Sequence, residues 1–362
     1  MDKILFKNND EFLLNSVKEV VDERKKAGLE NLIGGLESII INVEPEKFEA
    51  SIQELLNYTG YGLKESYEND LYQTTVLGLD ESADILVRAR KSEDNPFREF
   101  NIAPKSRSLP NTRLETFVFR CDDVKKYYDI QSKRGVEFLS NEINETSNYY
   151  FIQTKPSKFT GISIGLVQWK KDGRIYKDTD DEKMELNLLK PAHDYLENIK
   201  KLDHTATRVK ATDRDAAILE FMNLTNYNFE FAIYVKSFNS ITNVARLSDK
   251  DFAMVFTSGI SPYKNEEESG PTEKFIHNYN TRTHHLAFVT ENIEDTFQNL
   301  KCDGMDFLVE LVGSPEEGLK QTFSETSKHT FLVNEYIHRY GDFTGFFTRN
   351  NVTLLTESTS KQ

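Results

Sequence analysis

The sequence predicts an α+β fold in which two similar domains are each built from a pair of βαβββ modules. Three observations lead to this prediction. Four segments share one order of elements, in which a short apolar strand is followed by an amphipathic helix and then by further strands. The 362 residues suffice for roughly two domains of ordinary size. A polar stretch, rich in acidic residues, separates the second segment from the third.

The four segments follow one another along the chain. They begin at Leu36, Leu114, Leu202 and His284. Helices are expected over residues 46–58, 216–224 and 293–300, because apolar side chains recur there with helical spacing. In the first of these helices, Phe48, Ile52 and Leu55 fall on one face. The second and fourth segments also match in R-G-V-E-F-L and D-G-M-D-F-L, which favours duplication of a single module.

The repeats divide the chain into four parts. We expect an N-terminal helical extension over residues 1–30, a first two-module domain over 31–175, a linker over 176–200 and a second two-module domain over 201–362. The charged helix expected over 11–26 should cover the outside of the first domain. A short helical pattern over 195–199 ends the linker.

Composition excludes several classes of protein. A net charge of −14 disfavours a general nucleic-acid binder, because phosphate groups would be repelled. Two cysteines are too few for a disulfide framework, a cysteine-rich zinc site or an iron–sulfur cluster. No apolar run reaches the 18 or more residues of a membrane span, and the start lacks the apolar core of a signal peptide. We therefore expect a cytoplasmic protein.

Two of the seven histidines stand at matching places in the repeat. His204 and His285 lie on the first strands of the third and fourth segments, where the first domain has Ser38 and Thr116. A single histidine is more often an ordinary hydrogen-bonding residue than a ligand. Two at equivalent positions in only one domain indicate a duplicated scaffold with one working site.

A third ligand candidate lies near the end of the fourth segment. Glu335 shares a strand face with Val333 and Ile337, whereas the corresponding place in the first domain has Gly165. A carboxylate on a buried face is costly unless it is paired or binds a metal. Two imidazoles and one carboxylate form the facial triad of non-haem iron(II) sites. The alternative is that Glu335 pairs with a cation, namely Arg339, Arg349 or Lys328.

The second half carries five short motifs in a fixed order. They are L-D-H at 202–204, E-K-F-I-H-N-Y-N-T-R-T-H-H-L-A-F at 273–288, Q-T-F-S at 321–324, E-Y-I-H-R at 335–339 and F-T-R-N-N-V-T-L-L at 347–355. Together they resemble the 4-hydroxyphenylpyruvate dioxygenases of the vicinal oxygen chelate superfamily, whose glyoxalase-like half-open barrels consist of paired βαβββ modules. The first half resembles them only in the order of its modules.

The resemblance implies a function. It makes His204, His285 and Glu335 ligands of Fe(2+), and it places the catalytic domain in the second half behind a closing C-terminal segment. Gln321 matches a pocket glutamine, and Phe323 and Phe347 match pocket aromatics that hold the substrate. The expected reaction converts an aromatic 2-oxo acid and O2 into a decarboxylated, hydroxylated product, homogentisate, in tyrosine catabolism. A homodimer or homotetramer is also implied.

The sequence departs from this family around the substrate. It reads Gly259-Ile260-Ser261-Pro262 where the family has Asn-Glu-Pro, Val352 replaces a terminal phenylalanine, and the stretch between Phe307 and Gln321 is shorter. His284, next to the expected ligand His285, should point to the opposite strand face and either support the site from outside or face solvent. None of these changes affects the metal ligands.

Three alternatives therefore stay open. A 4-hydroxymandelate synthase-like enzyme would hydroxylate the benzylic carbon of the same substrate. An extradiol ring-cleavage dioxygenase shares the scaffold and the triad, but it needs a further acid or base, for which only His284 or Tyr336 is at hand. A metal-free small-molecule-binding protein would suit the altered pocket wall.

Overall fold

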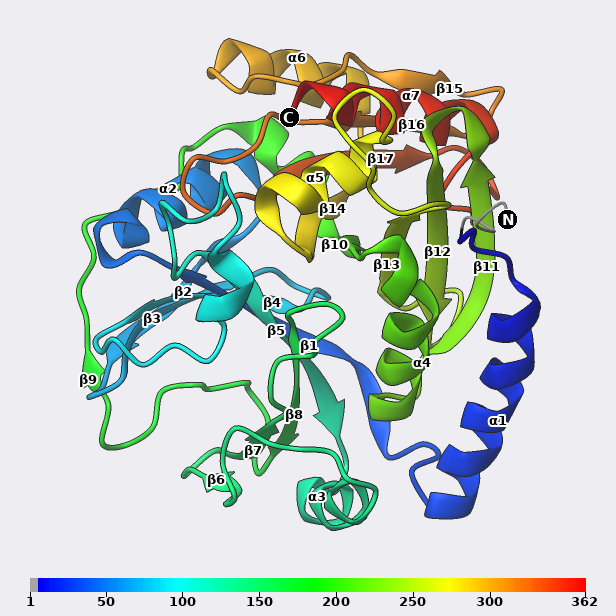
Figure 1. The fold of residues 1–362 in the computed structure, drawn as a ribbon. Helices are drawn as coiled ribbons and strands as arrows, with labels where there is room; N and C mark the ends of the chain where they lie inside the picture. The colour runs from blue at the N-terminus through cyan, green and yellow to red at the C-terminus, as the bar shows by residue number, and fades with distance from the viewer. Residues whose placement is uncertain (1–5) are drawn as a thin grey trace.

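The chain forms two mixed β-sheets with helices packed around them, which confirms the predicted α+β fold of two domains (Figure 1). The computed structural model describes residues 6–362, without the side chains of Arg349 and Lys361. In this part of the chain no helix is both long and apolar enough to span a bilayer.

The first sheet has nine strands in the order β6-β7-β8-β5-β1-β4-β3-β2-β9. At its centre β1 pairs in parallel with β4 and antiparallel with β5. The strand bounds are β1 (Ile33–Val43), β2 (Gly62–Glu68), β3 (Tyr72–Gly78), β4 (Asp84–Arg90), β5 (Arg113–Cys121), β6 (Asn144–Glu145), β7 (Tyr149–Gln153), β8 (Ser163–Trp169) and β9 (Glu182–Lys183).

The second sheet repeats this arrangement with eight strands in the order β11-β12-β13-β10-β14-β17-β16-β15. Strands β10, β14 and β17 take the places of β1, β5 and β8, with the same mixture of parallel and antiparallel pairing. The strand bounds are β10 (Ile199–Arg208), β11 (Asn228–Val235), β12 (Ser240–Arg246), β13 (Ala253–Gly259), β14 (Arg282–Thr290), β15 (Val312–Ser314), β16 (Leu319–Phe323) and β17 (Val333–Arg339).

The helices begin and end close to the predicted positions, and a short 3₁₀ turn, η3 (Asp194–Asn198), stands where a helical pattern was expected before β10. Three further helices, α3, α5 and α7, complete the set of α-helices in the described residues. The helix bounds are α1 (Glu11–Ala27), α2 (Phe48–Tyr58), α3 (Val124–Lys133), α4 (Arg214–Leu224), α5 (Pro271–Tyr279), α6 (Ile293–Cys302) and α7 (Arg349–Ser358).

Helix α1 contradicts one prediction, because it lies against the second half of the chain and not on the outside of the first (Figure 1). Its buried Arg24 donates hydrogen bonds to the carbonyl oxygens of Met222, Thr225 and Tyr227, at 2.9, 3.0 and 2.8 Å. The last carbonyls of a helix such as α4 have no partner within the helix. Arg24 satisfies one of them, that of Met222, together with two carbonyls that follow α4, which no local pattern reveals.

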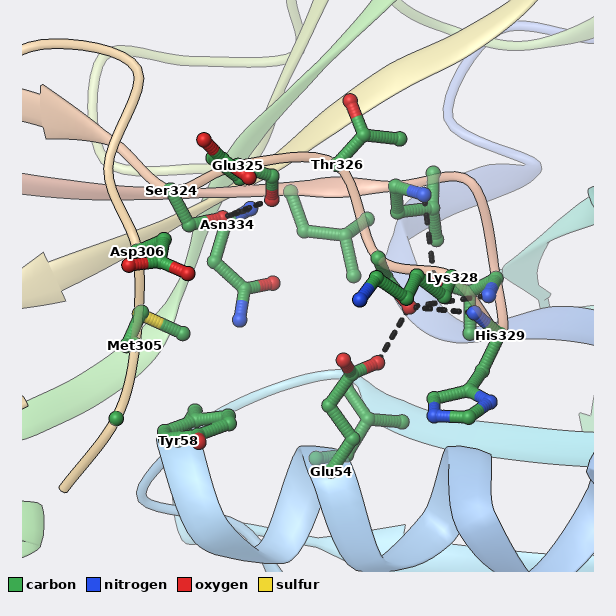
Figure 2. A pocket seen from close by; sticks show the side chains of 16 residues that line it. Glu54, Tyr58, Met305, Asp306, Ser324, Glu325, Thr326, Lys328, His329 and Asn334 are labelled. Carbon is green, nitrogen blue, oxygen red and sulfur yellow. Dashed lines mark hydrogen bonds between the residues drawn. The ribbon is translucent and has the colours of Figure 1, made fainter.

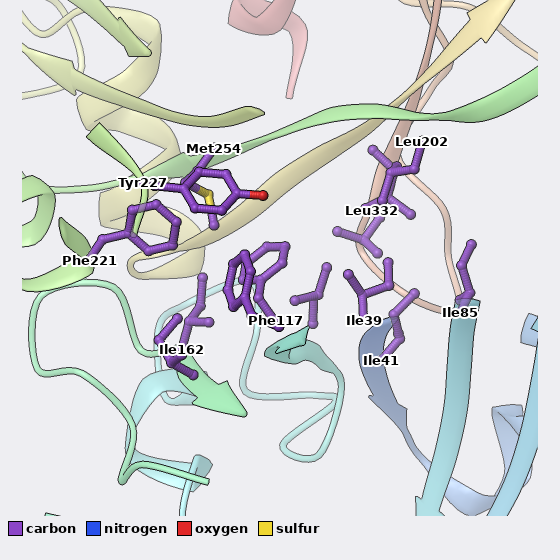
Figure 3. Packing of buried hydrophobic residues seen from close by; sticks show 14 of the residues in the cluster. Ile39, Ile41, Ile85, Phe117, Ile162, Leu202, Phe221, Tyr227, Met254 and Leu332 are labelled. Atoms are coloured by element: carbon purple, nitrogen blue, oxygen red, sulfur yellow. The ribbon is translucent and has the colours of Figure 1, made fainter. Parts of the chain in front are cut away.

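One hydrophobic core joins the two halves (Figure 3). Ile39 and Ile41 of β1 contribute from one side, and Phe221 and Met254 contribute from the other. Because side chains alternate along a strand, the positions between the core residues face the opposite surface of each sheet. In β10 that surface receives His204, Ala206 and Arg208.

Candidate metal centre

Three side chains meet on the inner face of the second sheet, and they are the three that the sequence singled out. His204 comes from β10, His285 from β14 and Glu335 from β17. Glu335 Oε2 lies 3.2 Å from His204 Nε2 and 3.2 Å from His285 Nε2. One potential ligand atom from each residue lies within 4.8 Å of those of the other two, so a single cation fits between them.

The lack of hydrogen-bond partners at these atoms is consistent with binding of a metal ion. His204 Nε2, His285 Nε2 and Glu335 Oε2 are all buried, and none has a hydrogen-bond partner among the described residues. Buried polar atoms are rarely left unsatisfied, because each one costs about 1–3 kcal/mol. Three of them pointing at one spot, with two imidazoles and a carboxylate as donors, match the ligand set of a divalent transition metal.

Asp203 and Arg339 fix the His204 ring from behind. Asp203 Oδ2 lies 2.7 Å from His204 Nδ1, and Arg339 donates to both oxygens of Asp203, at 2.7 and 2.9 Å. Burial by itself would lower the pKa of His204, but the carboxylates of Glu335 and Asp203 outweigh it and raise the pKa to about 9. Burial likewise opposes ionisation of Asp203, yet its contacts with His204 and Arg339 hold its pKa well below its usual range. The site therefore favours positive charge between the two acids.

His284 supports His285, although the two residues are neighbours in sequence. Ala206 pairs with His285 and Thr207 with Thr283, so His284 is an extra residue in β14, a β-bulge. The prediction that it points to the opposite face assumed regular alternation. The bulge breaks that alternation, and His284 Nδ1 lies 2.9 Å from His285 Nδ1. His284 is buried and does not face solvent.

A second bulge explains the position of Asp203. Leu202 pairs with Phe288 and His204 with Ala287, which leaves Asp203 as the extra residue of β10. On both central strands the residue just before the ligand is thus displaced towards it. Carboxylate or imidazole partners of this kind fix the ring and the tautomer of a metal-binding histidine.

Gln321, expected as a pocket glutamine, lies behind Glu335. Its Nε2 donates to Glu335 Oε1 at 2.7 Å and to the carbonyl oxygen of Phe346 at 3.2 Å. Asn351 of α7 donates in turn to Gln321 Oε1 at 3.3 Å. These contacts orient the carboxylate. They leave its other oxygen, Oε2, for a cation.

A small cavity of about 50 Å³ adjoins the site at His285. Phe323 and Phe347 line it, as the sequence led us to expect, and the ring of Phe323 lies 4.9 Å from that of His285. Val352 and Leu355 of α7 close it. The C-terminal segment that was expected to close the site forms the 10-residue helix α7, whose residues line the cavity.

The first sheet has different residues at the positions equivalent to the three candidate ligands. The strand registers place Ser38, Thr116 and Gly165 where the second domain has His204, His285 and Glu335. The sequence repeat predicted these three equivalences. Among the described residues, the duplicated scaffold thus carries one set of candidate metal ligands.

Another pocket, of about 200 Å³, lies between α2 and loops of the second half (Figure 2). Glu54 from α2 accepts a hydrogen bond from Ser327 there, and burial raises the pKa of Glu54. Tyr58, Asp306 and Lys328 also line this pocket. It contains none of the three convergent ligands.

The alternative pairing of Glu335 with a basic side chain is not seen among the described side chains. Arg339 binds Asp203 instead, and Lys328 lies in the pocket of Figure 2. The side chain of Arg349 lies outside the described part of the structure.

Sequence reasoning missed Asp203 and Arg208. Asp203 adjoins a candidate ligand in the motif L-D-H, but only the bulge shows that it turns towards His204. Arg208 could have been predicted from the sequence, because it follows His204 by four residues on one strand and the two-residue period of a strand places both on one face.

Comparisons with known proteins address the fold. The chain superposes on a triple mutant of 4-hydroxymandelate synthase from Streptomyces coelicolor with a TM-score of 0.66 and 16% identity, covering 91% of this chain and 99% of that one. The fold is that of the vicinal oxygen chelate proteins.

Two other solved structures have this vicinal oxygen chelate fold. A xylose isomerase-like TIM barrel/4-hydroxyphenylpyruvate dioxygenase fusion protein gives a TM-score of 0.59 at 12% identity; the match covers 91% of this chain and about half (53%) of the fusion. An Mn(II)-bound glyoxalase from Novosphingobium aromaticivorans gives 0.50 at 11% identity, covering 87% of this chain and 86% of that one. No protein-family model and no curated protein matches the sequence.

Proposed function

We propose that this protein is an iron(II)-dependent dioxygenase of the 4-hydroxyphenylpyruvate dioxygenase type, which decarboxylates and hydroxylates a 2-oxo acid. The observation that carries the proposal is the convergence of three buried, unpaired atoms, His204 Nε2, His285 Nε2 and Glu335 Oε2. Bound iron(II) supplies the redox chemistry and open coordination positions for a chelating substrate.

The residues around the ligands have separate roles in this proposal. Asp203 accepts the Nδ1 proton of His204, so that Nε2 keeps a lone pair for the ion. Gln321 binds one oxygen of Glu335 and leaves the other directed at the centre. Phe323 and Phe347 hold the organic part of the substrate and keep water away, and α7 closes behind it.

The named neighbours favour two reactions over others on this scaffold. One similar structure is a 4-hydroxymandelate synthase and another contains a 4-hydroxyphenylpyruvate dioxygenase. Formation of homogentisate from 4-hydroxyphenylpyruvate, a step of tyrosine catabolism, is the first candidate. Formation of 4-hydroxymandelate by benzylic hydroxylation is the second. Chromatography and mass spectrometry of the product separate them.

The first measurement is the amount of iron that the protein binds. Protein reconstituted anaerobically with iron(II) should hold about one ion per chain by elemental analysis, and it should consume oxygen when a 2-oxo acid is added. Glu335→Gln keeps the size of the side chain but removes the anionic ligand, so both iron binding and oxygen uptake should be lost. Thr116→Ala changes the position equivalent to His285 in the first sheet and should alter neither.

Two results would overturn the proposal. Full iron occupancy in Glu335→Gln and in His204→Ala would show that the ion binds elsewhere. Stoichiometric iron without oxygen uptake on any 2-oxo acid would support a binding protein or a different metal-dependent enzyme.

A further inference from the structure

Arg208 stands on the wall of the cavity beside the candidate metal centre. It follows His204 and Ala206 on the same face of β10, and it lines the cavity together with His285. Four residues of a strand span about 13 Å, so its backbone lies well away from that of His204. The long side chain is only 5% exposed.

The charge of Arg208 has no acidic partner in the described part of the chain. Its one hydrogen bond runs from Nη1 to the carbonyl oxygen of Pro271 at a long 3.4 Å, and its guanidinium lies 4.4 Å from the ring centroid of Phe275. Buried arginines elsewhere are compensated in two ways: Arg90 pairs with Glu115, whereas Arg113 donates to an amide oxygen and to carbonyl oxygens. Burial lowers the pKa of Arg208 to about 9, which still leaves the group cationic at neutral pH.

The cavity that Arg208 lines is polar at this end, and no carboxylate is among its described lining residues. Thr257 pairs with Arg208 across β10 and β13, and its Oγ1 is buried without a hydrogen-bond partner. Hydroxyl groups of Ser240, Thr242 and Thr272 line the same end of the cavity. A buried guanidinium without an acidic partner, next to a hydroxyl without a hydrogen-bond partner, forms a binding site for an anion. Buried charges are normally compensated by an opposite charge.

We propose that Arg208 binds a carboxylate at the end of the substrate remote from the metal, so that the preferred substrate is a 2-oxo acid with a second acidic group. The inference rests on the proposed function for the metal-chelating end, and at the other end it replaces the phenol of the two candidate reactions with a carboxylate. A neutral ring or a phenol would leave the guanidinium buried and uncompensated. A carboxylate can accept two hydrogen bonds from guanidinium and a third from the Thr257 hydroxyl.

The test compares matched 2-oxo acids that differ only at the remote end. The pairs are 2-oxoadipate with 2-oxohexanoate and 4-carboxyphenylpyruvate with phenylpyruvate, with 4-hydroxyphenylpyruvate as the phenol. Affinities are measured by calorimetry on the full chain under anaerobic conditions, with iron(II) and again without metal. The carboxylate-bearing member of each pair should bind at least about tenfold more tightly, because a hydrogen bond to a charged group contributes about that much.

Variants assign this preference to Arg208. Arg208→Met keeps the apolar stem and should abolish the preference, while Arg208→Lys should retain part of it. Arg88→Met is the matched control, since Arg88 lines the corresponding cavity of the first domain, where the ligand residues are missing. It should leave the preference unchanged.

The outcomes separate the two ends of the substrate. The proposal is overturned if the wild type binds phenylpyruvate as well as 4-carboxyphenylpyruvate, or if Arg208→Met weakens both members of a pair equally, as expected if Arg208 held the 2-oxo acid's own carboxylate. If Arg208→Met does not fold, the proposal is still tested by the wild-type preference for the carboxylate-bearing acids and by the reduced preference expected in Arg208→Lys. If iron does not bind, the proposed function fails, whereas the metal-free comparison still tests Arg208.

Discussion

The Nδ1 atoms of His284 and His285 lie 2.9 Å apart, although the two residues are consecutive on one strand. The bulge in β14 makes this contact, and the bulge in β10 makes the matching contact between Asp203 and His204. Each candidate histidine ligand is therefore oriented by the residue that precedes it. The same two bulges occur in β1 and β5 of the first sheet, where Glu37 and Glu115 are the displaced residues.

Replacing His284 should weaken metal binding without removing a ligand. When His285 Nε2 binds the ion, its Nδ1–H donates to His284, whose Nε2 lies 2.9 Å from Gln362 Oε1. His284→Leu removes that acceptor, so the affinity for iron(II) should fall about 10–100-fold. His284→Gln restores an acceptor and should recover most of the loss. Titration against a competing chelator measures both, and an unchanged affinity in His284→Leu would contradict this role.

Asp203→Asn should lower the affinity for iron(II) by about tenfold, because a neutral amide stabilises the ligating His204 less well than a carboxylate does. Arg339→Met leaves the carboxylate in place and should have a smaller effect. The same chelator titration compares the two variants. A larger loss in Arg339→Met would show that Arg339, and not Asp203, governs the site.

Gly165→Ala should destabilise the first domain. An added Cβ would lie 2.9 Å from Phe151 Cε2 and 3.1 Å from both Thr116 Cγ2 and Val118 Cγ2. Crowding of this kind costs about 1–3 kcal/mol of unfolding free energy. Gly62→Ala is the control, since its Cβ would meet no atom within 4 Å. Urea unfolding of both variants measures the difference, and equal midpoints would rule out the predicted crowding.

Alkaline pH should destabilise the protein through its buried tyrosines. Burial raises the pKa of Tyr61, Tyr127, Tyr227 and Tyr336 above the usual value of 10.0. Above about pH 10 these phenols ionise in the unfolded chain but stay protonated in the folded one. The unfolded state then binds fewer protons, so stability is complete below pH 10 and falls as pH rises.

Absorbance at 295 nm and circular dichroism follow this transition. Ionisation of the buried tyrosines should coincide with loss of secondary structure, and Tyr227→Phe should move the midpoint to higher pH. Full ionisation in a chain that stays folded would contradict the assignment.

Much of the site was predictable because repeats and strand periodicity are properties of the sequence. Duplication pointed to His204 and His285, and a carboxylate among apolar neighbours pointed to Glu335. The sequence identified Gln321 as a site residue and predicted that its side chain lines the substrate pocket. In the structure this side chain lies behind Glu335 and donates a hydrogen bond to it. Only the packing of β16 against β17 determines which of its neighbours it meets.

The sequence by itself determined the α+β modules, their duplication and which half carries the histidine and glutamate candidate ligands, since all of these follow from local patterns that recur along one chain. Tertiary structure decided the rest. A bulge depends on how two strands pair, so the turning of His284 and Asp203 towards the centre is invisible before the register is known. The docking of α1 through Arg24 and the isolation of the Arg208 charge depend on which distant groups are, or are not, brought within hydrogen-bonding distance.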